Sequence, residues 1–306
     1  MPVLLPPAAF VQSDEAMQRA WTEIDSLAYT QWLATHHYEN FHVVSFLLPK
    51  RLHQDFYNVY GFCRWADDLG DEIGDTAKSL ELLAWWRREL HAMYAGQAKH
   101  PVFVALRATA ARHQLPVQPF DDLITAFEQD QTVTRYSNFE ELFQYCRYSA
   151  NPVGRLVLGL CGYRDPERQA LSDATCTALQ LANFWQDVIV DLEKDRVYLP
   201  LDLLARHGYS VEQLFARRFD ARFRAAMKEA VAAARDLFLK GLPLADQVDR
   251  RLAIDLELFS RGGLKILEKI ERQDYDVLTA RPAISKTERV GLLLGALTRR
   301  AFSRAA

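Results

Sequence analysis

The sequence is poor in cysteine, and its four cysteines follow no pairing or metal-binding pattern. Cys63, Cys146, Cys161 and Cys176 are scattered and lack the CxxC spacing that zinc sites and redox motifs use. Disulfides are typical of secreted proteins, whereas isolated cysteines in a large core are typical of reduced thiols. We therefore expect a cytosolic protein without disulfides or zinc.

Long apolar runs, a signal peptide and a strong excess of one charge are also missing. The longest apolar stretches, Val43–Leu48 and Val290–Leu297, are far shorter than the ~20 residues that a membrane-spanning helix needs. The N-terminal MPVLLPPAAF has no basic residues and carries prolines where the apolar part of a signal peptide would lie. The formal net charge of −3 gives no general attraction for nucleic acid. We expect a cytoplasmic protein whose attachment to the inner membrane, if any, is peripheral.

Strand patterns are absent as well. No segment alternates strictly between apolar and polar residues over several positions bounded by turn residues. Apolar residues recur instead at helical spacing from end to end, so the sequence predicts an all-α protein. No long polar stretch separates the helices, and residues 1–306 are therefore expected to form a single domain. The predicted helices cover residues 14–35, 51–69, 77–95, 101–114, 118–129, 138–162, 166–191, 211–217, 219–241, 246–273 and 285–302.

A pair of aspartates that occurs twice is the most informative feature that is present. Asp67 and Asp71 stand four residues apart in RWADDLGDE, and Asp187 and Asp191 have the same spacing in NFWQDVIVD. Side chains at this spacing share one face of a helix, and like charges there cost roughly 0.2–0.5 kcal/mol. A solvated face would explain one such pair, but the second pair lies in an apolar run where unpaired carboxylates are expensive. We therefore expect a cation to bridge each pair.

Further polar side chains extend both pairs into stripes along their helices. The first stripe consists of Tyr60, Arg64, Asp67 and Asp71, and the second of Gln180, Asn183, Asp187 and Asp191. Both stripes are rich in oxygen donors and contain no histidine or cysteine. This suits Mg²⁺, which commonly binds a few protein carboxylates while substrate phosphates complete its shell. Two such stripes facing each other would hold a diphosphate through bridging Mg²⁺ ions.

Basic and polar residues flank the stripes. Arg196, just after the second stripe in KDRVYLP, could pair with carbonyl groups at a helix end or bind a diphosphate with its planar fork, and we favour the diphosphate. Upstream of the first stripe, His37 and Asn40 in HHYENF are expected to donate to phosphate oxygens. A metal site at His36 and His37 is disfavoured, because adjacent residues on a helix point in different directions.

A proline interrupts the helical pattern in YCRYSANPVG. Pro152 cannot donate a helix hydrogen bond to the carbonyl of Tyr148 and should kink the helix there. One interpretation is a break that only bends the chain around the core. The other is a polar niche in an apolar cavity, formed by the freed carbonyl and Asn151. Tyr145 and Tyr148 beside it could stabilise a carbocation, because a cation over an aromatic face gains roughly 0.5–2 kcal/mol.

Three long motifs, in this order, resemble those of the squalene/phytoene synthase family: YGFCRWADDLGDE at 60–72, YCRYSANPVG at 145–154 and QLANFWQDVIVDLEKDRVYLP at 180–200. The resemblance implies an isoprenoid synthase fold, a helical bundle with a central active-site cavity, and Mg²⁺-dependent ionisation of an allylic diphosphate. Two prenyl chains are then joined head to head through a cyclopropyl intermediate. By position, the resemblance assigns Mg²⁺ to Asp67, Asp71, Asn183, Asp187 and Asp191, and the substrate diphosphate or its ions to His37, Asn40, Tyr60, Arg64, Gln180, Arg196 and Tyr198.

Within this family, HYENF at 37–41, SANPVGRLVL at 149–158 and Gly262-Gly263 resemble the hydroxysqualene synthase branch of bacterial hopanoid pathways. This implies that presqualene diphosphate is ionised and its cation trapped by water, giving hydroxysqualene and pyrophosphate, with hand-off to other squalene-pathway enzymes. The catalytic water is expected at the kink, held by Asn151 and oriented by Tyr145 or Tyr148. No nicotinamide cofactor is expected, and no GxGxxG unit is present. Two alternatives stay open: condensation of two farnesyl diphosphates to presqualene diphosphate or squalene, and a non-catalytic helical assembly partner.

Overall fold

The computed structural model describes residues 4–36 and 48–302. These residues fall into two compact units, the first comprising Met1–Thr132 and Arg155–Arg164, and the second Val133–Gly154 and Asp165–Ala306. Across the described ranges the only β-type pairing is an isolated bridge between Arg135 and Val197, so the prediction of an all-α protein is confirmed. The expectation that residues 1–306 act as one domain stays a prediction.

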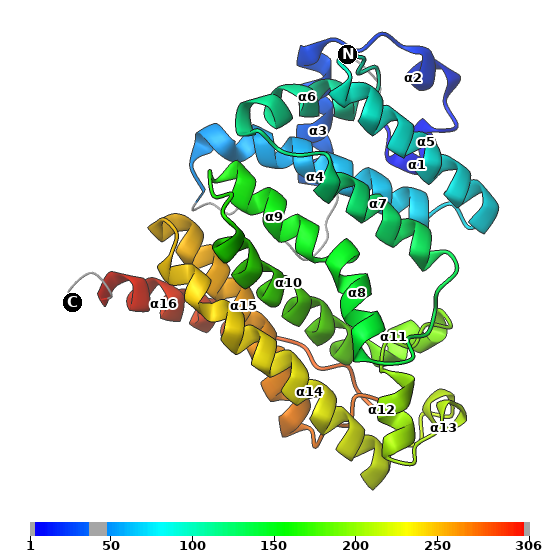
Figure 1. Ribbon diagram of the computed structural model, residues 1–306, viewed down its shortest axis with the longest axis vertical. Coiled ribbons are helices and arrows are strands. Elements are labelled where there is room, and N and C mark those ends of the chain that lie inside the picture. The colour runs from blue at the N-terminus through cyan, green and yellow to red at the C-terminus, as the bar shows by residue number, and fades with distance from the viewer. Residues whose placement is uncertain (1–3, 37–47, 303–306) are drawn as a thin grey trace. The chain divides into compact units, whose positions relative to one another are not determined.

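The first unit is built around helix α4 (Lys50–Asp71), which packs against α3, α5, α6 and α7 (Figure 1). Its core is aromatic: the buried rings of Trp65 and Trp86 stack with centroids 4.9 Å apart, and the His100 ring meets Trp65 edge-on at 4.3 Å. The other helices of this unit are α1 (Pro7–Phe10), α2 (Asp14–Gln18), α3 (Glu23–His36), α5 (Thr76–Tyr94), α6 (Pro101–His113) and α7 (Gln118–Asp130).

A buried polar network fixes the position of α4 on α6. The carboxylate of Asp55, which is 1% exposed, accepts hydrogen bonds from Thr109 and Arg112, both at 2.7 Å. His113 lies 2.9 Å from the same carboxylate. Because a buried carboxylate is tolerated only when it is paired and hydrogen-bonded, this network holds α4 in one orientation. The face of α4 that carries Asp67 and Asp71 is thereby set.

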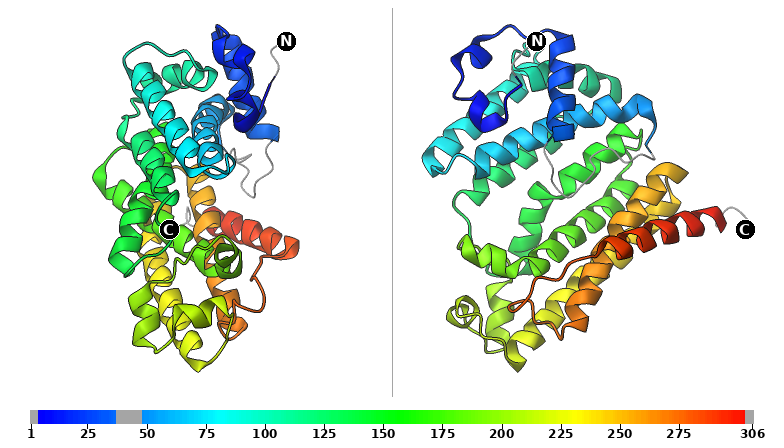
Figure 2. Two further views of the ribbon diagram at one scale, coloured as in Figure 1. Left: turned by 90° about the vertical axis from the view of Figure 1, so that its right-hand side faces the viewer. Right: turned by 180° about the vertical axis from the view of Figure 1, so that it is seen from behind.

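The second unit is built around α10 (Pro166–Gln186), which lies beside α14 (Ala221–Gly241) and α15 (Arg250–Arg272) in all views (Figures 1 and 2). The indole of Trp185 donates to the carbonyl of Ala230 at 3.0 Å, and so ties α10 to α14. The remaining helices of this unit are α8 (Phe139–Ser149), α11 (Val188–Glu193), α12 (Leu201–Arg206), α13 (Val211–Phe215), the 3₁₀ helix η1 (Leu242–Asp246) and α16 (Lys286–Phe302). Helix α9 (Asn151–Leu160) belongs to the second unit up to Gly154 and to the first from Arg155.

Glycine permits α14 and α15 to approach closely. A Cβ atom at Gly263 would lie 2.1 Å from Cζ of Phe238, a ring that is fully buried on α14. Such a distance is far inside van der Waals contact, so any side chain at this position would displace the ring. Packing within the unit therefore explains why glycine stands at position 263. A Cβ at Gly262 would meet nothing within 4 Å.

Three predicted helices are interrupted. The predicted kink at Pro152 is confirmed, because residues 138–162 form two helices that separate at Ala150. Residues 166–191 break at Asp187, whose φ of −104° and ψ of 14° are not helical. Residues 14–35 break after α2, where Arg19 takes an extended conformation. The short helices α1 and α12 were not predicted, since each is too short to show a period.

Two further expectations concern the chain as a whole. All four cysteines are free thiols, as predicted. Within the described ranges, no helix combines the length and the apolar character that crossing a bilayer requires.

Candidate active site

The first aspartate stripe lies on the last turns of α4. Arg64, one turn before Asp67, places one guanidinium nitrogen 2.5 Å from Oδ1 of Asp68 and another 3.4 Å from Oδ2 of Asp67. The Asp68 side chain is only 4% exposed and that of Arg64 11%, so this is a nearly buried ion pair. Asp68 is missing from the predicted site. It is adjacent to Asp67 in sequence, and only the structure shows that both carboxylates reach the same guanidinium.

The other members of this stripe differ in exposure. Tyr60 is half-buried, whereas Asp71 is exposed at the C-terminal end of the helix. Asp67 keeps 39% of its side-chain surface exposed. The stripe therefore runs from a covered tyrosine to open carboxylates, an arrangement that lets a hydrated cation approach Asp67 and Asp71.

The second stripe survives the break between α10 and α11. Asp187 ends α10, yet its N–H still donates to the carbonyl of Asn183 at 2.9 Å, and the N–H of Asp191 donates to the carbonyl of Asp187 at 2.9 Å. The four-residue hydrogen-bond register is kept across the junction, so Asn183, Asp187 and Asp191 stay on one side as predicted. Gln180 is half-buried and Asn183 is exposed.

An arginine from a distant loop pairs with Asp187. Both Nε and one terminal nitrogen of Arg281 contact the two carboxylate oxygens, the second at 3.2 Å. The same loop is held to α10 by the Gln186 side chain, whose Nε2 donates to the Pro282 carbonyl at 2.6 Å. The hydrogen bond to Asp187 raises the pKa of the Arg281 guanidinium. No sequence pattern points to Arg281, because 94 residues separate it from its partner.

The surroundings of Asp191 disfavour its charged form. Burial, and then the charge of Asp187, raise the pKa of Asp191 to about 7, while Arg196 and Lys194 act in the opposite direction. Arg196 lies close because its N–H donates to the Asp191 carbonyl at 2.8 Å. The intervening Asp195 takes a left-handed conformation with φ of 54°, which reverses the chain at the end of α11. Two neighbouring carboxylates with incomplete neutralisation form a site that favours a cation.

Aromatic rings pack beside the second stripe. Tyr198 stacks on Phe184 of α10 with centroids 3.7 Å apart and planes 6° from parallel. Tyr145 of α8 joins them at 6.2 Å from Phe184, and Tyr136 stacks on Tyr198 at 5.8 Å. The predicted site residues Tyr145 and Tyr198 are therefore brought into one aromatic cluster. Tyr148 is half-buried one turn further along α8.

The break between α8 and α9 places the side chain of Asn151 and Oγ of Ser149 in buried positions. Thr177 of α10 donates to Oδ1 of Asn151 at 2.9 Å, and these residues are 7% and 4% exposed. Oγ of Ser149 is buried, with no hydrogen-bond partner among the residues that the structure describes. A buried hydroxyl without a partner costs about 1–3 kcal/mol unless water or a ligand satisfies it. Ser149 was not predicted, although it begins the SANPVG segment.

Comparison with known proteins identifies the chain. The family profile described as squalene/phytoene synthase matches residues 34–288. The chain belongs to the squalene/phytoene synthase family. It is therefore an isoprenoid synthase that acts on a prenyl diphosphate, and the non-catalytic alternative has no support.

Relatives with two different activities are similarly close to this squalene/phytoene synthase family member. A hydroxysqualene synthase of Rhodopseudomonas palustris is 34% identical over 277 residues, covering 88% of this chain and 93% of the relative. A 15-cis-phytoene synthase of Synechococcus elongatus is 33% identical over 261 residues, covering 79% and 83%. The crystal structure of squalene synthase HpnC from Alicyclobacillus acidocaldarius is 44% identical, with a TM-score of 0.79 over 83% of this chain and 95% of that chain.

Members of this family use a divalent metal, and the donors on both stripes fit such an ion. The candidate ligands offer only oxygen, which suits Mg²⁺, and the raised pKa of Asp191 marks a carboxylate that a cation would stabilise. No group of three or more His, Cys, Asp or Glu side chains that could hold a metal is found in the described ranges. His37 and Asn40 lie outside the described residues.

Proposed function

We propose that this enzyme converts presqualene diphosphate and water to hydroxysqualene and pyrophosphate, with Mg²⁺ as its metal. Two relatives support this choice, the hydroxysqualene synthases of Rhodopseudomonas palustris and Sinorhizobium fredii, both 34% identical and both covered over 93% of their length. The observation that carries the proposal is the buried hydroxyl of Ser149 beside Asn151 at the α8–α9 break, which has no hydrogen-bond partner among the described residues.

In this proposal the two aspartate stripes bind the metal and the diphosphate. Mg²⁺ neutralises charge on the departing pyrophosphate, as metal ions do at developing anions. Arg196 adds a planar guanidinium beside the second stripe, positioned by its backbone hydrogen bond to Asp191. The proposed Mg²⁺ ligands are Asp67, Asp71, Asn183, Asp187 and Asp191. The proposed contacts to the diphosphate or its ions are His37, Asn40, Tyr60, Arg64, Gln180, Arg196 and Tyr198.

The water that ends the reaction is proposed to lie at the α8–α9 break. Departure of pyrophosphate breaks the carbon–oxygen bond, the cyclopropane opens, and the water oxygen bonds to the resulting cationic carbon and releases a proton. A water in an apolar surrounding needs two to four polar partners. Ser149 and the amide nitrogen of Asn151 supply two, since the Asn151 oxygen is occupied by Thr177. Tyr145 or Tyr148 then orients the water.

The aromatic cluster has a role consistent with this chemistry. Tyr145, Tyr198 and Phe184 present π faces next to α10, the helix that also carries Thr177 and Asp187. Thr177 and Asp187 are ten residues apart, about 15 Å of helix rise. A hydrocarbon chain lying along this face would run past the rings. A cation over the face of such a ring is stabilised by roughly 0.5–2 kcal/mol.

A second candidate reaction is the head-to-head condensation of two farnesyl diphosphates to presqualene diphosphate or squalene. The similarity to phytoene synthases, at 33% identity for the Synechococcus elongatus enzyme, supports this second candidate. Both reactions share the ionisation of a prenyl diphosphate, so the aspartate stripes do not distinguish them. The two reactions differ in the fate of the final cation.

The deciding experiment is product analysis. The purified enzyme is incubated with Mg²⁺ and either presqualene diphosphate or farnesyl diphosphate, with and without NADPH, in heavy-oxygen water. We expect labelled hydroxysqualene from presqualene diphosphate, independent of NADPH. Formation of presqualene diphosphate from farnesyl diphosphate, without any alcohol, would assign the condensation instead. A cytoplasmic location, peripheral membrane contact, hand-off to other squalene-pathway enzymes and independence from nicotinamide cofactors remain parts of the proposal.

A further inference from the structure

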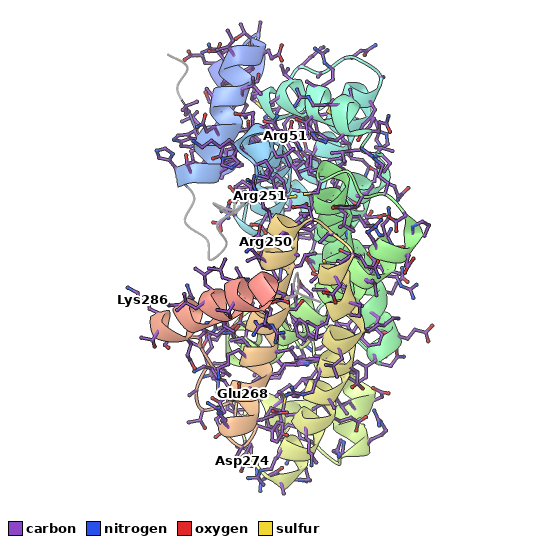
Figure 3. All side chains as sticks on the ribbon, turned by 90° about the vertical axis from the view of Figure 1, so that its left-hand side faces the viewer. Arg51, Arg250, Arg251, Glu268, Asp274 and Lys286 are labelled. Atoms are coloured by element: carbon purple, nitrogen blue, oxygen red, sulfur yellow. The ribbon has the colours of Figure 1, made fainter. Side chains whose placement is uncertain are left out.

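A groove of about 560 Å³ lies between three helices of the second unit, α14, α15 and α16. Figure 3 shows α16 lying across α15, with Glu268 labelled on α15 and Lys286 at the start of α16. The groove is separate from the aspartate stripe of this unit, because none of Asn183, Asp187 and Asp191 lines it. Its lining residues are Arg235 and Leu239 of α14, Arg261, Leu264, Lys265 and Glu268 of α15, and Glu288, Gly291, Leu292, Gly295 and Arg299 of α16.

Helical spacing explains why these side chains meet. On α15, Arg261, Leu264, Lys265 and Glu268 follow at intervals of three, one and three residues, which places them on one face. On α14, Arg235 and Leu239 are one turn apart. Each wall therefore mixes leucine with a cationic side chain, and the groove is amphipathic rather than purely apolar.

Positive charge exceeds negative charge among the ion pairs around the groove. Arg261 is poorly satisfied, since its Nε is 3.6 Å from Glu257 and has no hydrogen-bond partner among the described residues. Glu257 is also shared with Arg299 at 3.1 Å. Six cations use four carboxylates here, in the pairs Arg235–Glu271, Arg261–Glu257, Arg299–Glu257, Lys265–Glu268, Arg272–Glu268 and Lys269–Glu288. An anion entering the groove would supply the negative charge that these ion pairs lack.

Two glycines keep the α16 wall of the groove flat. A Cβ at Gly291 would meet no atom within 4 Å, and a Cβ at Gly295 would meet only the guanidinium of Arg299, at 3.3 Å. Each glycine inside a helix costs about 1 kcal/mol relative to alanine. No internal packing within the unit accounts for Gly291, so the open space that it borders is the feature to explain.

Exposed apolar side chains lie on one wall of the groove and on the part of α16 outside it. Leu239 on the α14 wall is 55% exposed. Val290 and Leu294, which do not line the groove and which define the outward side of α16, are 56% and 57% exposed. Apolar tips next to cations are the combination by which helices bind the interface of a bilayer that contains anionic lipid.

We propose that this groove and the outward side of α16 dock on a bilayer, with the phosphate of an anionic phospholipid in the groove. Arg261, Lys265 and Arg299 contact the phosphate, and Leu239 and Leu294 enter the apolar boundary. This deepens the peripheral membrane contact that is part of the proposed function by naming the surface and the lipid class. Because the test involves no turnover, its failure leaves the proposed reaction untouched.

The test compares binding to vesicles of phosphatidylcholine alone with vesicles that also contain phosphatidylglycerol, by sedimentation of the full-length chain. We expect binding that requires phosphatidylglycerol. The double variant Arg261→Gln/Lys265→Gln should lower the partition coefficient about tenfold or more, since each basic residue near an anionic surface contributes about fivefold. The matched control is Arg250→Gln/Arg251→Gln at the other end of α15, labelled in Figure 3, which should stay within about twofold.

A second pair of variants covers the case in which loss of the Glu257 contacts loosens α16. Gly291→Glu adds a carboxylate in the open space of the groove, and Gly291→Gln adds the same volume without charge. We expect the Glu variant to bind vesicles at least about fivefold more weakly than the Gln variant. Equal binding of these two, an equal loss in the Arg250/Arg251 control, or equal binding to both kinds of vesicle would each overturn the proposal. Complete competition by inorganic phosphate at constant ionic strength would do so too, and would assign the groove to a free anion.

Discussion

Arg281 holds Asp187 through both carboxylate oxygens, although 94 residues separate them in the chain. The guanidinium thus takes the position of a cation at a carboxylate that we assign to Mg²⁺. Burial and the charge of Asp187 raise the pKa of the neighbouring Asp191 to about 7, although Arg196 and Lys194 act in the opposite direction. We infer that a metal ion binding here must compete with Arg281 for Asp187.

Replacing Arg281 with alanine should therefore strengthen the binding of Mg²⁺ in the absence of diphosphate. The pair is partly exposed, at 46% and 28% of the two side chains, so its contribution is expected to be at most ~1 kcal/mol, about fivefold in affinity. Calorimetric titration with Mg²⁺ measures this directly. The control is Arg206→Ala, which removes an exposed arginine paired with Glu229 and should leave Mg²⁺ binding unchanged. Weaker Mg²⁺ binding in Arg281→Ala would show that Arg281 supports the metal instead of competing with it.

Asp67→Ala and Asp187→Ala should each lower turnover by about 100-fold or more while the fold is kept. Removing a ligand takes away the electrostatic help given to the departing pyrophosphate, a term that is typically ~3 kcal/mol or larger. Steady-state kinetics across a Mg²⁺ series, with circular dichroism to monitor folding, tests this. Asp236→Ala, which removes an exposed carboxylate from α14, should behave like the wild type. Full activity of either stripe variant in the presence of a chelator would exclude the metal assignment.

Arg64 serves two partners, and substitution should separate them. Arg64→Ala leaves the nearly buried carboxylate of Asp68 without its guanidinium, which should cost about 3–5 kcal/mol of unfolding free energy. Arg64→Lys keeps the charge but not the planar fork, so a stable variant with reduced turnover is expected. Urea unfolding and kinetics of both variants are the measurements. Normal turnover in Arg64→Lys would confine Arg64 to its ion pairs with Asp67 and Asp68.

The parts of the site that are periodic along one helix could be predicted from sequence. Asp67 and Asp71, and Asp187 and Asp191, share a face by their four-residue spacing alone, and a proline at 152 dictates a break whatever surrounds it. The residues that were missed depend on long-range folding or on burial. Arg281 reaches Asp187 only because the loop before α16 returns to α10. Ser149 stands out only because its oxygen is buried and no residue within the described ranges hydrogen-bonds to it.

The break at Asp187 shows the same limit in the prediction of the fold. The sequence predicts one helix over 166–191, and its hydrogen-bond register does continue from Asn183 to Asp191. Only the backbone angles of Asp187 change, at the residue where Arg281 and the loop at Pro282 meet the helix. Local propensity carries no information about that contact. A tertiary interaction of this kind is the usual reason why a helix boundary departs from its sequence pattern.

His100 should make the protein less stable in mild acid. Burial among Trp65, Trp86 and Phe10 lowers the pKa of the imidazole well below 6.5, and its Nδ1 accepts the N–H of Val102 at the start of α6. Below pH 6.5 the unfolded chain binds a proton that the folded protein excludes. Stability is therefore complete above this pH and is lost as the pH falls towards the folded pKa, by up to about 1.4 kcal/mol per pH unit.

Urea unfolding at pH 7.5, 6.5 and 5.5 measures this loss. His100→Asn keeps a side chain that can cap α6 but removes the titration, so its stability should fall less between pH 6.5 and 5.5, by about 1 kcal/mol. His91→Gln, at an exposed histidine on α5, serves as the control and should lose stability in acid like the wild type. An acid dependence in His100→Asn equal to that of the wild type would assign the loss to other groups.

The last prediction concerns the water at the α8–α9 break. Ser149→Ala removes the buried hydroxyl that has no partner in the described protein, and so removes one of the two groups proposed to hold the water. The alcohol should then fall as a share of all products from presqualene diphosphate, and elimination or rearrangement products should rise. Asn151→Ala with Pro152→Ala should act in the same direction, because it removes the amide and restores a regular helix. Gas chromatography with mass detection, in heavy-oxygen water, gives both the share and the label.

Thr177→Val provides the matched control for this niche. It removes the donor to Asn151 without touching Ser149, and so frees the Asn151 oxygen, which is then available to accept from water. Its alcohol share should stay near that of the wild type, whereas a passive loosening of the break would lower it in all three variants alike. An unchanged share and unchanged labelling in both Ser149→Ala and the double variant would place the nucleophilic water elsewhere. Absence of alcohol from the wild-type enzyme would refute the hydroxysqualene assignment, because water would then not be the group that ends the reaction.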